Sequence, residues 1–450
     1  MKQSYNPLRS VTLLSPAPSY FEALRDRRRP LTQMQRLPRQ GLLALEAVTP
    51  PDWEVNIIDE RIEPIVPEKI DSPIVGITAM TYMAPRAFAL ARQLKALGKT
   101  VVLGGFFPTL TPELALAESG VDSIVIGRGE HAWPLLLTDF TNGQLKRSYR
   151  HPFGHHGYKL PQVNFNLTGP KLGYNGWLTQ VQTSLGCKFH CRFCAIPPFH
   201  TRQFALRDMD DVTDEVANAP TQRIYFVDDN LLNHPVYLEK LCDRLRPVQK
   251  GWSGQLSMDI RGHQQLLKKM RQSGCFWIHV GIESLDQATL KTQEKMQNNV
   301  QKYLDTVNLI RDEGISVSAG MMFGFPTDPA SVFETTENFL DRAGLDSVSF
   351  HFYTPFPGSS DFKTLADADQ LVTRQLEHYD TYHVIVRTKN FTTEELTEKV
   401  EALQYRFYRP YQVVKRMLRG LSNGHSGIAR TFAGGAMGYI NRRQGLPLHP

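Results

Sequence analysis

Short apolar runs recur along the first 145 residues, and stretches with helical spacing lie between them. The runs are VTLLSP (11–16), VNIIDE (55–60), PIVGITAM (73–80), TVVLGG (100–105) and SIVIGRGE (123–130). Runs that are apolar throughout, alternating with helical segments such as 85–97, predict a parallel sheet buried on both faces. We therefore expect a doubly wound, Rossmann-like α/β domain over residues 1–145.

Small and polar residues follow several of these predicted strands. Open parallel sheets bind ligands at the carboxyl ends of their strands, and small residues let a ligand approach the backbone. The pattern predicts a binding edge formed by Thr78, Thr81, Gly104, Gly105, Gly127, Gly129 and Glu130.

Residues 146–178 are rich in Gly, His, Pro and Asn and show little periodicity, which predicts a linker. We interpret its histidines, His151, His155 and His156, as loop residues, because a metal site needs partners at a defined spacing.

Six further strand-like runs, 25 to 40 residues apart, occupy 179–365. This interval predicts repeated βα units and a partial (β/α)6 barrel, in which chemistry sits on the loops after the strands. Polar residues cluster there: Asp228, Asp229 and Asn230 after the second run, and Glu283 and Ser284 after the fourth. For Asn230 and Ser284, helix capping is an equally good interpretation. The runs are TQVQTSLG (179–186), RIYFVDDN (223–230), WSGQLSMDI (252–260), FWIHVGIES (276–284), SVSAGMMFGF (316–325) and SVSFHFYTPF (347–356).

Three of the five cysteines, Cys187, Cys191 and Cys194, follow the first of these runs as Cx3CxxC. A structural zinc site wants four ligands, so zinc would need His190 or His200 as the fourth, and that alternative stays open. Three thiolates suit a [4Fe–4S] cluster with one iron left open to a small molecule.

With these cysteines at the start of a βα barrel, the chain resembles the radical S-adenosylmethionine (SAM) enzymes. The resemblance implies that the three cysteines hold a [4Fe–4S] cluster and that Phe193 lies near SAM. It also implies SAM contacts at Asp228, Asp229, Asn230, Glu283 and Ser284. The implied chemistry is reductive cleavage of SAM to a 5′-deoxyadenosyl radical, which abstracts hydrogen from an unactivated carbon, with an electron from a reductant such as flavodoxin or ferredoxin.

The first domain resembles the cobalamin-binding domain that precedes the barrel in many of these enzymes. The segments GITAMTYMAPRAFALARQL (76–94), GGFFPT (104–109) and GVDSIVIGRGEHAWPLLL (120–137) carry that resemblance. Two positions depart from the common pattern, Phe107 in place of histidine and Arg128 in place of an acidic residue, and no DxHxxG motif is present. The implied ligand is cobalamin without a histidine below the cobalt; the alternative is a domain that kept the fold and lost the ligand.

Residues 366–450 show helical patterns at 393–411 and 412–419, with aromatic and basic side chains intermixed. We interpret them as a helical lid packed on the barrel, and an interfacial helix touching an anionic membrane is the alternative. Segments including YTPFPGS (353–359) and FYRPYQVVKRML (407–418) resemble the subgroup that contains hopanoid C-2 methylases, which implies a lipid or other apolar substrate.

Composition limits the cellular compartment and the partners that the chain is expected to have. No apolar run is long enough to span a bilayer, the start of the chain lacks a signal-peptide pattern, and five scattered or clustered cysteines do not suggest disulfides, so we expect a cytoplasmic protein. A net charge of +6 is too weak to predict nucleic-acid binding, although it tolerates an anionic ligand or the inner membrane surface.

Together these features predict a cobalamin-dependent radical SAM methyltransferase acting at an unactivated carbon. Two alternatives stay open: a cobalamin-using radical SAM enzyme that does not transfer methyl, and a non-enzymatic zinc or iron–sulfur protein.

Overall fold

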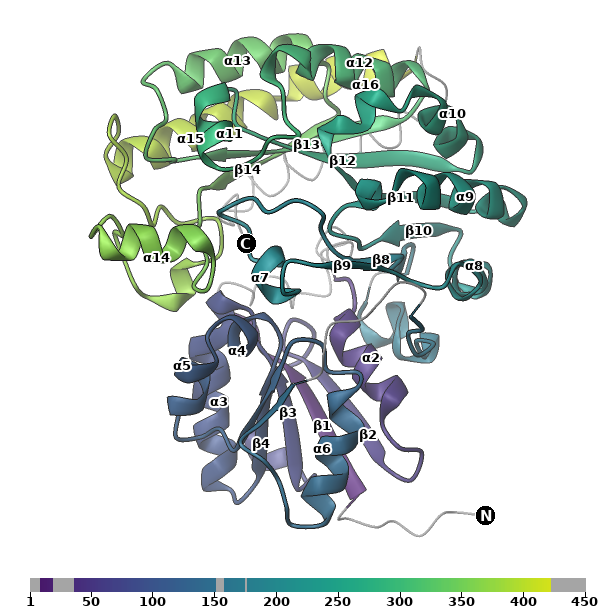
Figure 1. Cartoon of the computed structure of the whole chain (residues 1–450), viewed down its shortest axis with the longest axis vertical. Coiled ribbons are helices and arrows are strands. Elements are labelled where there is room, and N and C mark those ends of the chain that lie inside the picture. Colours follow the sequence, from purple (N-terminus) through teal and green to yellow (C-terminus); the bar gives the residue numbers. More distant parts are fainter. Residues whose placement is uncertain (1–8, 19–35, 151–157, 175, 422–450) are drawn as a thin grey trace.

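The computed structural model describes residues 9–18, 36–150, 158–174 and 176–421 and contains two α/β units. In Figure 1 the N-terminal unit, in purple and blue, lies below the larger unit in teal and green. Both expected architectures, the doubly wound sheet and the six-stranded partial barrel, are confirmed.

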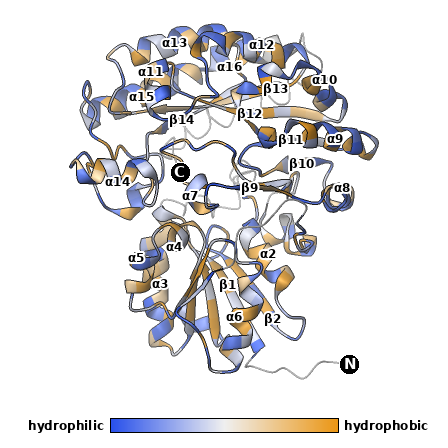
Figure 2. Cartoon of the chain, viewed as in Figure 1, coloured by the Kyte–Doolittle hydropathy of each residue, from blue (hydrophilic) through white to orange (hydrophobic). Residues whose placement is uncertain are grey.

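The N-terminal unit is built on a six-stranded parallel sheet in the order β2-β1-β3-β4-β5-β6. Alternate side chains of each strand enter two separate cores, one under α3 and α5 and the other under α2 and α6. This burial of both faces explains the unbroken apolar runs of the strands, which Figure 2 colours largely orange. The elements are β1 (Ser10–Ser15), α2 (Gln40–Val48), β2 (Glu54–Asp59), β3 (Ile74–Thr78), α3 (Ala84–Ala96), β4 (Thr100–Gly104), α4 (Phe106–Leu110), α5 (Pro112–Ala117), β5 (Ser123–Ile126), α6 (Ala132–Thr141) and β6 (Ser148–Arg150).

Strand β6 lies inside the segment that the sequence predicts to be a linker. Its middle residue, Tyr149, is buried and its phenol donates to Asp139 at 2.8 Å, while Ser148 and Arg150 are exposed. Three residues are too few to show a period of two, so the strand leaves no pattern in the sequence. The sheet thus continues past residue 145, and His151, His155 and His156 lie outside the described residues.

The second unit is a parallel six-stranded sheet in the order β14-β13-β12-β11-β10-β7, curved into part of a barrel. Its outward side chains form the largest core with the surrounding helices, so the polar positions of each strand face inward. The elements are β7 (Thr179–Val181), β8 (Ser184–Gly186), α7 (Ile196–Phe199), β9 (Phe204–Leu206), α8 (Met209–Asn218), β10 (Arg223–Phe226), α9 (Pro235–Leu245), β11 (Gly251–Leu256), α10 (Gln264–Gln272), β12 (Cys275–Glu283), α11 (Gln287–Thr292), α12 (Tyr303–Asp312), β13 (Ser316–Phe323), α13 (Val332–Ala343), β14 (Ser347–Phe352) and α14 (Ser360–Asp367).

The first barrel strand is shorter than predicted. The run 179–186 divides into β7, which belongs to the barrel, and β8, which leaves it to pair antiparallel with β9. At the break, the Asp228 carboxylate accepts hydrogen bonds from the Thr183 amide at 3.0 Å and from both the Thr183 and Ser184 hydroxyls. This carboxylate therefore holds the chain where it turns out of the sheet.

The C-terminal helices, α15 (Thr393–Phe407) and α16 (Pro410–Leu421), pack on the barrel as expected, but on its outer face. Phe407 contacts the Phe350 ring, and the Tyr408 hydroxyl donates to the Val348 carbonyl at 2.7 Å. Both helices lie on the side of the barrel sheet opposite the N-terminal unit (Figure 1). They do not cover the barrel mouth, and the Gly-rich tail after them lies outside the described residues.

Among the described helices, none combines the length and the apolar character needed to cross a membrane.

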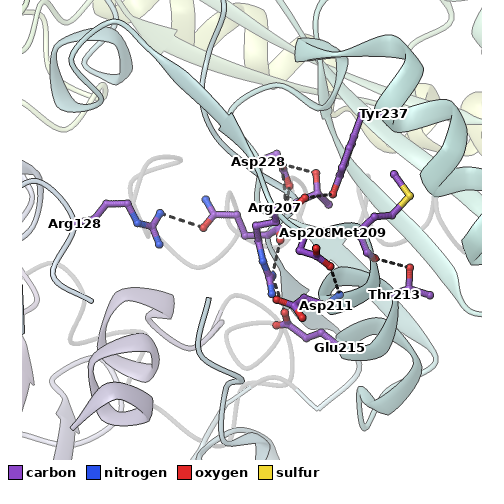
Figure 3. Close-up of polar contacts among 11 residues, drawn as sticks. Arg128, Arg207, Asp208, Met209, Asp211, Thr213, Glu215, Asp228 and Tyr237 are labelled. Carbon is purple, nitrogen blue, oxygen red and sulfur yellow. Dashed lines mark hydrogen bonds and ion pairs between the residues drawn. The ribbon is translucent and has the colours of Figure 1, made fainter. Parts of the chain in front are cut away.

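A buried ion pair joins β9 to α8 beside the barrel mouth, as Figure 3 shows. The Arg207 guanidinium lies 2.7 Å from the Glu215 carboxylate and also donates to the Gln182 carbonyl, and both charged side chains are buried. Burial raises the pKa of Glu215 even though Arg207 lies beside it, which reflects the cost of taking this pair out of water.

We expect Glu215→Gln to lower the free energy of unfolding by about 3 kcal/mol, because it leaves the Arg207 charge buried without its partner. Urea denaturation measures the change. The matched control is Asp210→Asn on the same helix, which removes an ion pair with Arg244 whose two side chains are 69% and 55% exposed. That control should cost less than about 1 kcal/mol, and equal losses for the two variants would contradict the argument.

Candidate functional site

The three clustered cysteines lie on the loop between β8 and α7, and all three are free thiols. The Cys194 backbone amide donates to the Cys191 carbonyl at 3.1 Å. Two amide groups approach the sulfur atoms: the Ile196 backbone amide lies 3.5 Å from the Cys194 sulfur, and the Gln297 side-chain amide lies 3.8 Å from the Cys191 sulfur. Burial raises the pKa of Cys187 to about 11. In the described part of the chain, no three His, Cys, Asp or Glu side chains are already gathered around a metal position.

The donor set on this loop fits an iron–sulfur cluster better than zinc. The two candidate fourth ligands are engaged elsewhere: His190 lies 3.3 Å from the Arg202 carbonyl, and His200 lies 3.9 Å from Asp229 and against the Phe199 ring. Three sulfur donors on one short loop are what a cluster with one open iron requires.

A buried lysine lies next to the cysteines. Lys295 Nζ is 2.9 Å from Glu283 Oε1 and 5.8 Å from the centre of the Phe193 ring. Burial alone would lower the pKa of Lys295, but the neighbouring Glu283 carboxylate favours the charged ammonium, and the pKa is raised. Phe193 and Glu283 are candidates from the sequence, whereas Lys295 is not, since it lies twelve positions after Glu283 and no spacing rule links them.

The residues predicted to contact SAM after the second barrel strand have different surroundings. Asp228 is buried with its carboxylate occupied by Thr183 and Ser184, so it holds the chain rather than facing the site. The Asn230 side-chain oxygen accepts from the Leu232 and Ser257 amides, while its buried Nδ2 has no partner among the described residues.

Asp229 and Ser284 also have different surroundings. Asp229 lines the space between the two units, and burial raises its pKa to about 7. Ser284 is buried and accepts a hydrogen bond from the Asp286 amide in the turn before α11, but the residue that caps this helix is Asp286, whose carboxylate accepts from the Thr289 amide. Of Asp228, Asp229, Asn230 and Ser284, only Asp229 lines the cavity between the two units.

A cavity of about 450 Å³ separates the carboxyl edge of the N-terminal sheet from the barrel mouth. That size lies within the roughly 300–1,000 Å³ of small-molecule sites. Thr81 does not reach the cavity, because it is buried in the turn before α3. The predicted edge residues that line the cavity are Thr78, Gly104, Gly105, Gly127, Gly129 and Glu130.

Glycine is required at position 105 of this edge because the backbone turns tightly there. Gly105 has a φ of 99°, and a Cβ on it would lie 2.9 Å from the Thr78 hydroxyl and 3.0 Å from the Ala79 carbonyl. A Cβ on Gly129 would meet the Leu45 side chain at 2.8 Å. This glycine-rich edge lets a bound macrocycle approach the backbone closely, so the residues present fit cobalamin.

The opposite wall of the cavity comes from the barrel. Arg128 forms an ion pair with Glu130 and donates to the Gln182 side chain at 3.3 Å across the interface. Figure 3 shows Arg128 reaching from the N-terminal unit toward the barrel. Phe106 stacks on Phe199 with ring centres 4.2 Å apart. These contacts tie the glycine-lined edge to the helix that follows the cysteine loop.

The two departures from the family pattern have clear positions. Phe107 is fully buried against Phe88 and cannot contact a ligand, whereas Arg128 lines the cavity. Among the described residues that line the cavity, the only histidine is His200, which comes from the barrel side.

The cysteine loop also reaches the far side of the barrel mouth. Arg192 Nε lies 2.7 Å from the Asp361 carboxylate of α14, which also accepts from the Tyr353 hydroxyl. This contact connects the loop after the first strand with the segment after the last one.

Comparison with known proteins agrees with this architecture. The model of the B12 binding domain matches residues 35–137, and that of the radical SAM superfamily matches 181–340, together more than half of the chain. The chain is similar to bacteriochlorophyllide d C-12(1)-methyltransferase of Chlorobaculum tepidum, at 28% identity over 81% of each protein. It is also similar to hopanoid C-2 methylase of Rhodopseudomonas palustris, at 25% identity over 71% of this chain and 63% of that protein.

Solved structures share the whole fold. The radical SAM methyltransferase TsrM from Kitasatospora setae, with cobalamin and a [4Fe–4S] cluster bound, superimposes with a TM-score of 0.70, covering 97% of this chain and 99% of that one at 14% identity. The cobalamin-dependent radical enzyme OxsB superimposes with a TM-score of 0.69 over 95% of this chain and 72% of that one, also at 14% identity.

The fold and its two linked sites thus define a cobalamin-dependent radical SAM enzyme, whose cofactors are a [4Fe–4S] cluster, SAM and cobalamin. The matched models give this chain a radical SAM domain and an N-terminal B12-binding domain, and the chain is similar to C-methyltransferases.

We expect Gly104→Leu to weaken hydroxocobalamin binding at least tenfold, measured by equilibrium dialysis on the purified protein. A Cβ on Gly104 meets only Val125 at 4.0 Å, so the backbone accepts a side chain, which then occupies the cavity. Gly262→Leu is the control, because an added Cβ there meets nothing within 4 Å and the position is not part of the cavity wall. Unchanged affinity in Gly104→Leu would place cobalamin elsewhere.

Proposed function

We propose that this protein methylates an unactivated carbon of a large, mostly apolar polycyclic substrate. The observation that carries the proposal is that one cavity has the glycine edge of the N-terminal sheet as one wall and, as the other, residues directly following the cysteine loop, including Phe199 and His200. Two cofactor sites that share a wall can both reach one substrate molecule at the barrel mouth.

The bound cofactors supply hydrogen abstraction through the cluster and SAM, and the methyl group through cobalamin. The residues of the protein bind these cofactors and orient them. We infer that Cys187, Cys191 and Cys194 hold the cluster, and that the Lys295 ammonium binds the carboxylate of SAM while Phe193 packs beside it. The face of the cobalamin ring would lie against Thr78, Gly104, Gly105, Gly127 and Gly129.

Inward-facing side chains of the barrel supply the surface for the substrate. His279 of β12 has its Nδ1 2.8 Å from the Ser318 hydroxyl, and His351 of β14 has its Nδ1 3.0 Å from the Thr381 hydroxyl. Burial lowers the pKa of both imidazoles, that of His279 to about 4, so both are neutral at physiological pH.

Trp277 lies beside His279 with ring centres 6.4 Å apart and planes tilted by 47°, so these side chains give the inward face an aromatic surface. Such a surface suits a polycyclic molecule, the feature that bacteriochlorophyllide and hopanoid substrates of the two relatives share. A reductant of the flavodoxin or ferredoxin type would supply the electron.

A second candidate is radical chemistry without methyl transfer. It is favoured by the similarity, at 24% identity over 79% of this chain, to anaerobic magnesium-protoporphyrin IX monomethyl ester cyclase of Rubrivivax gelatinosus. The two candidates differ in product mass, because only methylation adds a carbon.

The decisive experiment is anaerobic reconstitution with iron, sulfide and cobalamin, followed by turnover of SAM with a chemical reductant and, as candidate acceptors, a bacteriochlorophyllide and a hopanoid. We expect 5′-deoxyadenosine together with S-adenosylhomocysteine, one of each per methylated product, and neither from Cys191→Ala. 5′-Deoxyadenosine without S-adenosylhomocysteine, in the presence of bound cobalamin, would favour the second candidate.

Lys295→Met should leave the iron and sulfide content unchanged and weaken SAM binding at least tenfold, because it removes the buried cation nearest the cysteines. Binding is measured by equilibrium dialysis of the reconstituted protein. Glu283→Gln/Lys295→Met removes both charges of the buried pair and separates loss of the SAM contact from an unpaired buried carboxylate. Lys291→Met changes an exposed lysine one turn away and serves as the control. Normal SAM affinity in both Lys295 variants would exclude the assigned role.

A further inference from the structure

Helix α16 presents an apolar stripe to solvent. Tyr411, Val414 and Leu418 are 73%, 51% and 61% exposed, and their spacing of three and four residues places them on one face of the helix. We call these three residues the α16 stripe. Aligned apolar side chains on a monomer surface are uncommon, whereas single exposed ones are normal.

The opposite face of α16 is anchored in the protein, so the stripe is directed outward by packing. Val413 and Arg416 are each only 8% exposed. The Arg416 guanidinium lies 3.9 Å from the centre of the Phe407 ring and donates to the Phe407 carbonyl at 2.7 Å. Rotation of the helix to bury the stripe would break this contact.

The positive charge of the chain is concentrated in the same region. Residues 402–450 contain eight Lys and Arg and no Asp or Glu, whereas the preceding 401 residues contain 43 Lys and Arg against 45 Asp and Glu. Lys415 lies exposed beside the stripe. The net charge of +6 therefore comes from this end of the chain, because the residues before it are close to neutral.

We propose that α16 docks the protein on an anionic lipid membrane, with the α16 stripe inserted among the lipids and the basic residues facing the headgroups. An apolar face flanked by Lys and Arg is the pattern of an interfacial helix. Aliphatic Val414 and Leu418 favour lipid over nucleic acid, which would instead contact the cations and stack on aromatic rings. Because α16 lies on the side of the barrel away from the N-terminal unit, docking leaves the junction of the two units uncovered (Figure 1).

The test is cosedimentation of the full-length protein with vesicles of phosphatidylcholine alone or mixed with phosphatidylglycerol. We expect binding to the mixed vesicles, at least tenfold weaker binding to neutral ones, and a decrease as salt is raised. Replacing the stripe by Tyr411→Ser/Val414→Ser/Leu418→Ser should weaken binding at least tenfold, and Lys415→Gln about fivefold.

The matched control is Leu114→Ser/Leu135→Ser, which removes two leucines of the N-terminal unit that are 56% and 61% exposed. It should bind the vesicles as the wild type does. All variants change exposed side chains, so their far-UV circular dichroism and Tm should match the wild type. Cys191→Ala should also bind normally, which separates this inference from the proposed reaction.

Three results would overturn the proposal. Vesicle binding that does not change in the stripe variant would exclude insertion of the helix. Tight binding of a short DNA duplex, with equal affinity in wild type and stripe variant, would identify a polyanion site instead. A wild-type dimer in size-exclusion chromatography that the stripe variant converts to a monomer would show that a second copy covers the stripe.

Discussion

A single buried carboxylate, that of Asp228, determines where the first barrel strand ends and the site begins. It lies at the carboxyl end of β10 and accepts hydrogen bonds from Thr183 and Ser184 of the neighbouring chain. An unpaired carboxylate at this depth would be very costly, so these donors must stay with it. The chain therefore leaves the barrel after β7, enters the β8–β9 hairpin and delivers the cysteine loop over the barrel mouth. Through β9 the same turn places Arg207 in the wall of the cavity between the two units.

The barrel separates structural and chemical roles by the alternation of its strands. In β14, Val348, Phe350 and Phe352 pack under the outer helices, while Ser349 and His351 face inward. Since successive side chains of a strand point to opposite faces, inward residues can change without disturbing the outer core. The same helices that stabilise the barrel also carry α16 on the surface, remote from the inward face.

The sequence predicted the architecture well and the site unevenly, for physical reasons. Continuous apolar runs mark strands buried on both faces, so all but the shortest parallel strands were found. The break between β7 and β8 could not be predicted, because it depends on a carboxylate 45 residues further along the chain. Asp228 and Asp229 are adjacent in sequence after β10, but their side chains have different surroundings. Thr78 ends β3 and lines the cavity, whereas Thr81, three positions later, is buried in the turn before α3. Lys295 approaches Glu283 only through the tertiary fold.

The contact between Arg192 and Asp361 bears on how this scaffold can diversify. Within the described residues, β7 and β14 each pair on one side only, so the barrel sheet is an open arc. Part of that opening is bridged between the cysteine loop and α14 by this ion pair and by one backbone hydrogen bond, from the Asp361 amide to the Arg192 carbonyl, and not by a ladder between strands. Substitution of these two side chains can therefore change the width of the opening without unpairing a strand. Substitutions at this gap can in this way fit a new substrate to the same cofactors, while the sheet continues to stabilise the fold.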